Sequence, residues 1–209
     1  MKIQKFDYND IEELFANTYV VIDDNNDAVI IDPSVDNDKV GDFIIKNQIN
    51  PKAILLTHGH FDHIRGVDRL ATRFSIPLYI HYEEKELLID PYFNCSSQEQ
   101  EMIIHTNPIT VTDGEELHIL NDVIKVIHTP FHTQGSVCYY FINNNLLFTG
   151  DTLFKLSIGR SDLPTGDSRR IASSLSKLKN LPKETKIYPG HGPNSTLGFE
   201  LMLNNFFKY

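Results

Sequence analysis

Thr57-His58-Gly59-His60-Phe61-Asp62-His63 is the stretch that decides the fold, because it places four candidate metal ligands within six positions. It follows the apolar run at residues 53–56, which predicts a short buried strand. In open α/β sheets, ligands bind beyond the carboxyl ends of the strands. Histidine is the usual neutral nitrogen ligand of zinc-like ions, and aspartate supplies a hard oxygen. The spacing therefore predicts a loop that wraps one metal ion, or two ions that lie close together.

Three further candidate ligands follow three later predicted strands. His132, Asp151 and His191 come after the apolar runs at 123–127, 146–149 and 186–188, each flanked by Gly, Pro or Thr. A lone histidine is more often structural, and we expect that role for His81, His105, His118 and His128. The repetition at strand ends favours a metal site made of His58, His60, Asp62, His63, His132, Asp151 and His191.

Strand and helix patterns alternate along the 209 residues, without a linker, repeat or low-complexity tract. Residues 18–23 and 28–32 predict a hairpin, and Asp36 is the predicted cap of a helix that carries Val40, Phe43 and Ile44. A second hairpin is predicted at 136–149, and a last helix at 197–206, whereas 91–110 shows weak periodicity. We predict one α/β domain over residues 1–209, with helices outside and sheets inside.

Composition excludes several classes of protein. The 19 basic and 28 acidic residues give a net charge of −9, which argues against a nucleic-acid partner. The apolar runs are too short to span a bilayer, and the first residues lack the apolar core of a secretory signal. We therefore expect a cytoplasmic protein without a membrane partner. Cys95 and Cys138 are too few for a disulfide framework.

The motif His58-x-His60-x-Asp62-His63, followed by His132, Asp151 and His191, resembles the metallo-β-lactamase-fold superfamily over nearly the whole chain. The resemblance implies a four-layer αβ/βα sandwich with the metal site at the sheet edges. It implies that His58, His60 and His132 hold one metal, that Asp62, His63 and His191 hold a second, and that Asp151 bridges both. Two divalent ions are thus expected, zinc first, with iron and manganese as alternatives.

The stretches at 148–154 and 157–164 look like the glyoxalase II branch, especially its short bacterial YcbL-like members. Residues 129–136 are similar to the TPGHTPGS stretch of that branch, with Phe131 in place of the usual glycine. The chain ends about one helix after His191, so we expect no C-terminal helical domain of the full-length glyoxalase II kind.

This resemblance implies hydrolysis of thioesters such as S-lactoylglutathione by a metal-bound hydroxide. Asp62 is the candidate general base if only one metal site is filled. Arg160 is the candidate contact for a substrate carboxylate, with an ion pair to Asp162 as its alternative role. The expected partner is a small-molecule thioester.

Four alternatives to thioester hydrolysis can be compared with the sequence. A mono-iron persulfide dioxygenase is the main alternative, with His58, His132 and Asp151 as its iron ligands. Asp151 at the bridging position, together with the missing export signal, disfavours antibiotic hydrolysis. The charge of −9 disfavours a nuclease, and the filled ligand positions disfavour a non-catalytic module.

Overall fold

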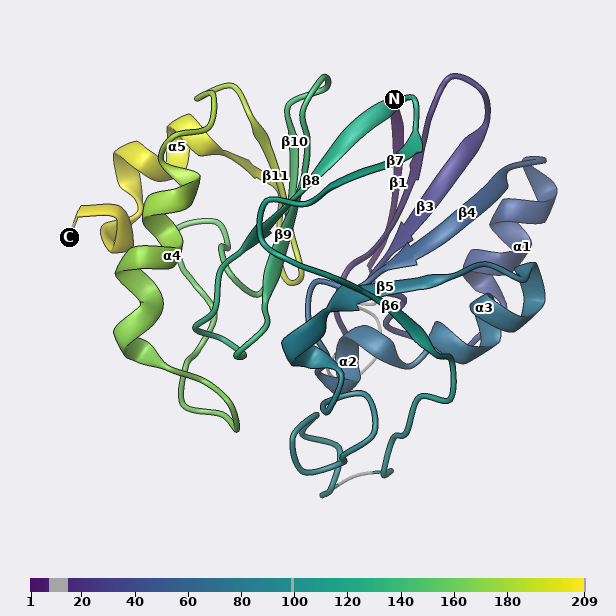
Figure 1. Ribbon diagram of the computed structural model, residues 1–209. Helices are drawn as coiled ribbons and strands as arrows, with labels where there is room; N and C mark the ends of the chain where they lie inside the picture. Colours follow the sequence, from purple (N-terminus) through teal and green to yellow (C-terminus); the bar gives the residue numbers. More distant parts are fainter. Residues whose placement is uncertain (8–14, 99, 209) are drawn as a thin grey trace.

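Two six-stranded sheets face each other in the computed structural model, which describes residues 1–7, 15–98 and 100–208 (Figure 1). The first sheet has the strand order β1-β2-β3-β4-β5-β6, and the second has the order β12-β11-β10-β9-β8-β7. Helices α1 and α3 lie outside the first sheet, and α4 and α5 lie outside the second (Figure 1). The predicted α/β sandwich of four layers is confirmed.

The elements follow each other mostly as the periodicity predicts. The strands of the first sheet are β1 Lys2–Phe6, β2 Thr18–Ile22, β3 Asp27–Ile31, β4 Asn50–Leu55, β5 Leu78–His81 and β6 Pro108–Val111. Those of the second are β7 Glu116–Leu120, β8 Asp122–His128, β9 Val137–Phe141, β10 Leu146–Gly150, β11 Lys186–Pro189 and β12 Ser195–Thr196. The α-helices are α1 Lys39–Lys46, α2 Phe61–Ile64, α3 Val67–Phe74, α4 Ile171–Leu178 and α5 Leu197–Leu203. Short 3₁₀ helices are η1 Tyr82–Glu84, η2 Ser168–Arg170 and η3 Asn205–Lys208.

Successive side chains along the strands of the first sheet point to opposite faces and belong to different apolar clusters. On β3, Ala28 and Ile30 pack under the helices of the first sheet, whereas Val29 and Ile31 point into the space between the sheets. This is the period of two of an extended strand, with both faces buried. A third apolar cluster, which includes Leu147 and Leu175, joins the second sheet to α4 and α5. The continuous apolar runs in the sequence follow from this arrangement.

Both predicted hairpins are confirmed, since β2 pairs with β3 and β9 pairs with β10, each antiparallel. The predicted cap of the first helix is wrong by two residues, because α1 starts after Asp38 and Asp36 instead pairs with Arg69. The last helix ends at Leu203, earlier than the predicted 206, and a 3₁₀ turn follows. Strands β1, β6 and β7 carry mixed polar and apolar residues and were not predicted.

Strand direction places the candidate ligands at one edge. Strand β9 is antiparallel to both β8 and β10, and β10 is parallel to β11. The carboxyl ends of β8, β10 and β11 therefore share one edge of the second sheet. In the part of the chain that the structure describes, no helix is long and apolar enough to cross a membrane.

Candidate metal centre

Four strand ends carry the seven predicted ligands. His58 and His60 follow β4, while Asp62 and His63 lie on the single turn of α2. His132, Asp151 and His191 follow β8, β10 and β11. All seven side chains meet where the two sheets adjoin, in overlapping groups whose ligand atoms lie within 4.8 Å of one another. The structure thus brings together every residue that the sequence assigned to the metal site.

The first group is His58, His60 and His132, all buried. Nδ1 of His60 lies 3.0 Å from Nε2 of His132. The other nitrogen of His132, Nδ1, donates to the carbonyl oxygen of Arg160 at 2.7 Å, so Nε2 presents its lone pair to the site. This contact fixes both the orientation and the tautomer of His132, as the partner groups of metal-binding histidines usually do.

The second group is Asp62, His63 and His191. Nε2 of His191 lies 3.1 Å from Oδ2 of Asp62, and Nε2 of His63 lies 3.8 Å from the same oxygen. On its other side, Nδ1 of His63 donates to Asp32 at 2.9 Å. Asp32 is itself buried and also accepts the amide and the hydroxyl of Thr57. Sequence reasoning missed Asp32, which carries no local signal beyond its place at the end of a strand.

Asp151 lies between the two groups. Its Oδ1 is 3.3 Å from Nε2 of His63, and its Oδ2 is 3.5 Å from Nε2 of His132 and 3.6 Å from Nε2 of His191. A glycine makes room for this carboxylate, because a Cβ on Gly190 would collide with Asp151 Oδ1 and approach Cε1 of His63 to 2.7 Å. One carboxylate in contact with both histidine groups suits the bridging position that the family resemblance implies for it.

Burial and neighbouring charges shift the pKa values of the histidines in opposite directions in the two groups. Burial lowers the pKa of His58 well below its usual value and that of His60 to about 3, and neighbouring histidines add to the effect. For His63, burial also lowers the pKa, but the carboxylates of Asp62, Asp151 and Asp32 outweigh it and raise the pKa above the usual value. His58 and His60 are therefore held as neutral imidazoles, whereas three carboxylates surround His63.

The donors fit a divalent metal. Nε2 of His58 and Nε2 of His60 are buried without a hydrogen-bond partner. Unpartnered buried polar atoms are costly, and a cation satisfies them together. Imidazole nitrogens with carboxylate oxygens suit zinc, iron or manganese. Cys95 and Cys138 are free thiols and belong to none of the ligand groups found among the described residues.

Arg160, the predicted contact for the substrate, forms an ion pair with Asp162. The guanidinium of Arg160 donates to both carboxylate oxygens of Asp162 at 2.7 Å, and the Arg160 side chain is 61% exposed. The ion pair that the sequence left as an alternative is therefore present. A role of Arg160 in substrate binding stays a prediction.

A further histidine pair lies outside the centre. His81 and His128 stack with ring centroids 4.0 Å apart, and Glu83 lies 3.4 Å from His128. The rings are inclined by only 19°, and Nε2 of His128 faces the carbonyl oxygen of Gln134 at 2.9 Å. A metal binds in the plane of an imidazole ring, so nearly parallel stacked rings suit a structural pair better than a metal site.

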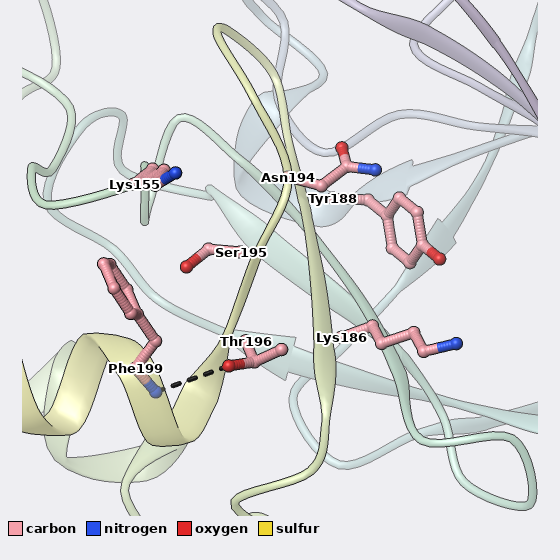
Figure 2. Close-up of a pocket in the computed structure, with 7 residues that line it drawn as sticks. All are labelled: Lys155, Lys186, Tyr188, Asn194, Ser195, Thr196 and Phe199. Atoms are coloured by element: carbon pink, nitrogen blue, oxygen red, sulfur yellow. Dashed lines mark hydrogen bonds between the residues drawn. The ribbon is translucent and has the colours of Figure 1, made fainter.

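A pocket of about 400 Å³ lies around β12 and the start of α5 (Figure 2). Its lining residues are Lys155, Lys186, Tyr188, Asn194, Ser195, Thr196 and Phe199, and none of them is a predicted ligand. Thr196 accepts the amide of Phe199 as the cap of α5, and Ser195 contacts Glu200. The two hydroxyl groups therefore already have partners within the chain.

Comparison with known proteins agrees with this geometry. The family model described as the metallo-beta-lactamase superfamily matches residues 11–191. A relative from Bacillus subtilis, the probable metallo-hydrolase YqgX, is 36% identical, with 91% of this chain and 92% of the relative covered. The hydroxyacylglutathione hydrolase GloC of Haemophilus influenzae is 31% identical, with 91% and 92% covered.

Solved structures show the same fold. The B3 metallo-beta-lactamase BLEG-1 superposes with a TM-score of 0.92 at 38% identity, over 100% of both chains. TTHA1623, crystallised in a di-iron-bound form, superposes with a TM-score of 0.80 at 34% identity, over 91% of this chain and 94% of the other. Together with the donor set and the metallo-hydrolase relatives, these matches identify a metal-dependent hydrolase, and the chain belongs to the metallo-beta-lactamase superfamily.

Proposed function

We propose that this protein hydrolyses thioesters of small thiols, with S-lactoylglutathione as the model substrate. The observation that carries the proposal is the Asp151 carboxylate, which contacts histidines of both ligand groups. A centre of this kind can hold two cations next to each other and present them to one acyl group. Similarity to a hydroxyacylglutathione hydrolase over most of both chains supports the choice of a thioester.

The residues of the site would have three roles: metal binding, proton transfer and substrate binding. His58, His60 and His132 would hold one divalent ion, Asp62, His63 and His191 a second, and Asp151 would contact both. Such ions lower the pKa of bound water towards about 7 and polarise a carbonyl oxygen. If only the first site is filled, the carboxylate of Asp62, which lies 3.1 Å from Nε2 of His191, would be free to act as general base for a nucleophilic water. Arg160 would exchange Asp162 for a carboxylate of the substrate.

We propose zinc as the metal, with iron and manganese as alternatives. The histidine-rich first group favours a borderline ion, whereas the carboxylates of the second also suit iron or manganese. The di-iron form of TTHA1623 supports keeping iron in the test. Metal content of protein grown in defined medium, together with activity after reconstitution with each metal, decides among them.

The test is hydrolysis of S-lactoylglutathione by zinc-loaded protein, followed as loss of thioester absorbance. We expect turnover that a chelator abolishes and that Asp151→Asn reduces at least 100-fold. Asp167→Asn is a matched control, because Asp167 is an aspartate that pairs with the exposed Arg169 and Arg170 instead of with the predicted ligands. No turnover above buffer by the zinc, iron or manganese form would reject the proposal.

A β-lactam is the second candidate substrate, because BLEG-1 is described as a B3 metallo-beta-lactamase. A chromogenic cephalosporin assayed on the same preparation separates the two activities. A kcat/KM for the cephalosporin above that for every thioester would replace the proposed function. Oxygen uptake with glutathione persulfide by the iron form tests the dioxygenase alternative in the same way.

A further inference from the structure

Glu84 is a fully buried carboxylate that touches both ligand-bearing loops. It lies on η1, directly after β5, and is 0% exposed. Its Oε2 accepts the amide of Gly59 at 2.7 Å, and its Oε1 accepts the amide of Gly135 at 2.7 Å. Gly59 separates the ligands His58 and His60, and Gly135 lies three residues after His132. One side chain therefore joins a loop of the first sheet to a loop of the second.

The fit around this carboxylate is tight. A Cβ on Gly135 would lie 2.8 Å from Cγ and 2.9 Å from Oε1 of Glu84. A Cβ on Gly59 would lie 3.3 Å from Oε2 of Glu84 and 2.6 Å from Cβ of Leu87. The amide side chain of Gln134 also donates to the carbonyl oxygen of Glu83 at 2.7 Å, which holds the second loop on η1. Both loops are thus seated on one short segment through direct contacts.

We propose that Glu84 is a positioning residue that sets the spacing between His58, His60 and His132, and with it the affinity and geometry of the metal that they bind. The inference rests on the metal centre of the proposed function but not on its substrate. The His60 and His132 nitrogens lie 3.0 Å apart across the two loops, so a small shift of either loop changes this ligand set directly. Residues that orient metal ligands typically change metal affinity about 10- to 100-fold when they are replaced.

The direct test is Glu84→Gln. A glutamine keeps the size but offers one carbonyl oxygen, and its NH₂ group would face one of the two backbone N–H donors. That donor would be left buried and unsatisfied, so the loop that carries it must move. Glu84→Asp is the second variant, because it keeps the charge but is one methylene too short to reach both amides.

Glu200→Gln is the matched control. Glu200 is also 0% exposed and accepts the amide of Leu156 at 2.8 Å and the side-chain amide of Asn204 at 2.9 Å. These contacts tie α5 to the loop after β10, away from Gly59 and Gly135. The control variant therefore loses a buried carboxylate of the same kind without loosening the two loops that Glu84 joins.

The measurement is titration of metal-free protein with Co²⁺, read by the visible absorption bands that report ligand geometry, together with the Tm of each metal-free variant. We expect Glu84→Gln and Glu84→Asp to weaken Co²⁺ binding at least tenfold and to alter the bands. Glu200→Gln should lower the Tm and keep both the affinity and the bands of the wild type.

Several outcomes overturn the inference. Wild-type affinity and bands in the Glu84 variants would do so. Failure of both Glu84 variants to fold while Glu200→Gln folds would do so too, because Glu84 would then serve general stability. A wild-type protein that binds Co²⁺ but hydrolyses no thioester would reject the proposed function and leave this inference standing.

Discussion

Arg160 faces different partners with its backbone and its side chain. Its carbonyl oxygen accepts Nδ1–H of His132, whereas its guanidinium pairs with Asp162. Exposed ion pairs contribute only about 0 to 1 kcal/mol, so a substrate carboxylate can displace Asp162 at little cost. Replacing the side chain therefore separates its role in substrate binding from the backbone contact that orients His132.

Arg160→Ala should raise the KM for S-lactoylglutathione about tenfold, the size expected when a charge-assisted hydrogen bond is lost. The kcat should stay within about twofold, because the carbonyl oxygen that orients His132 remains. Asp162→Ala, which frees the guanidinium, should not raise KM. Steady-state kinetics of the three proteins check this, and a fall in kcat at constant KM would point to a disturbed His132 instead.

At the scale of elements, the turn after β11 has to pass very close to the turn after β10. The amide of Gly190 donates to the carbonyl oxygen of Gly150 at 2.8 Å, and the Gly190 Cα faces Asp151 and His63. A methyl group at this position would displace the Asp151 carboxylate from between the two ligand groups. Here the absence of a side chain, rather than left-handed backbone, is what the element requires.

Gly190→Ala should therefore reduce the number of bound metal ions and lower kcat/KM at least tenfold, with the fold retained. The control is Gly114→Ala, since Gly114 has a φ of +80° but no atom within 4 Å of an added Cβ. That variant should lose about 1 to 2 kcal/mol of stability from the left-handed backbone and keep its metal. Metal analysis gives the number of bound ions in each variant, and urea unfolding gives its stability. Full metal content in Gly190→Ala would show that Asp151 tolerates a methyl group at this position.

The ends of β5 and β8 bring two histidines into a stack, which makes stability depend on pH. Burial lowers the pKa of His81 to about 4, and burial also lowers the pKa of His128. The folded pKa lies below the unfolded value of about 6.5, so the neutral form stabilises the fold above pH 6.5. This contribution is lost progressively as the pH falls from 6.5 towards 4.

Between pH 7 and pH 5, the free energy of unfolding of the wild type should fall more than that of His81→Gln, which cannot take up the proton. His118→Gln is the control, because His118 is exposed on β7 and should leave the wild-type slope unchanged. Urea unfolding of the metal-loaded proteins at both pH values gives the comparison. Equal slopes for wild type and His81→Gln would show that the stacked pair does not control acid stability.

At the scale of the whole molecule, the metal centre joins the two halves of the sandwich. His58, His60, Asp62 and His63 follow a strand of the first sheet, and the other three ligands follow strands of the second. The unfolded chain cannot hold these ligands together, so binding energy of the metal adds to the stability of the fold. Loss of the metal should therefore lower the stability of the whole fold.

Removal of metal by a chelator should lower the Tm by roughly 5 to 10 °C. Saturation at 100 times Kd contributes about 2.7 kcal/mol, and about 1 kcal/mol shifts the Tm of a chain this long by about 2 to 4 °C. Thermal unfolding with and without zinc measures the shift. In Asp151→Asn, zinc should raise the Tm by less than it does in the wild type. Equal Tm values for the wild type with and without metal would contradict a centre that spans both sheets.

The fold and the ligand set were predictable from the sequence because both leave local signals. Apolar runs such as 28–31 report strands buried on both faces. Five of the seven ligands lie beside Gly or Thr, and the other two, Asp62 and His63, belong to the same short motif as His58 and His60. Short or mixed segments such as β1 and β7 leave weak signals, since they lie at sheet edges with residues exposed. The start of α1 after Asp38 is a similar case, because both Asp36 and Asp38 pair with Arg69, which lies 33 and 31 positions away, and the Asp38 side chain makes no cap hydrogen bond.

The sequence by itself determined the layered α/β fold and named the residues of the metal site, since these depend on periodicity and on residue type next to strand ends. Only the tertiary structure decided which groups support those residues. Asp32 reaches His63 across 31 positions, and Glu84 reaches Gly59 and Gly135 across 25 and 51. A buried carboxylate looks in sequence like any exposed one, and only the packing of two sheets shows that it has lost its water and gained these partners.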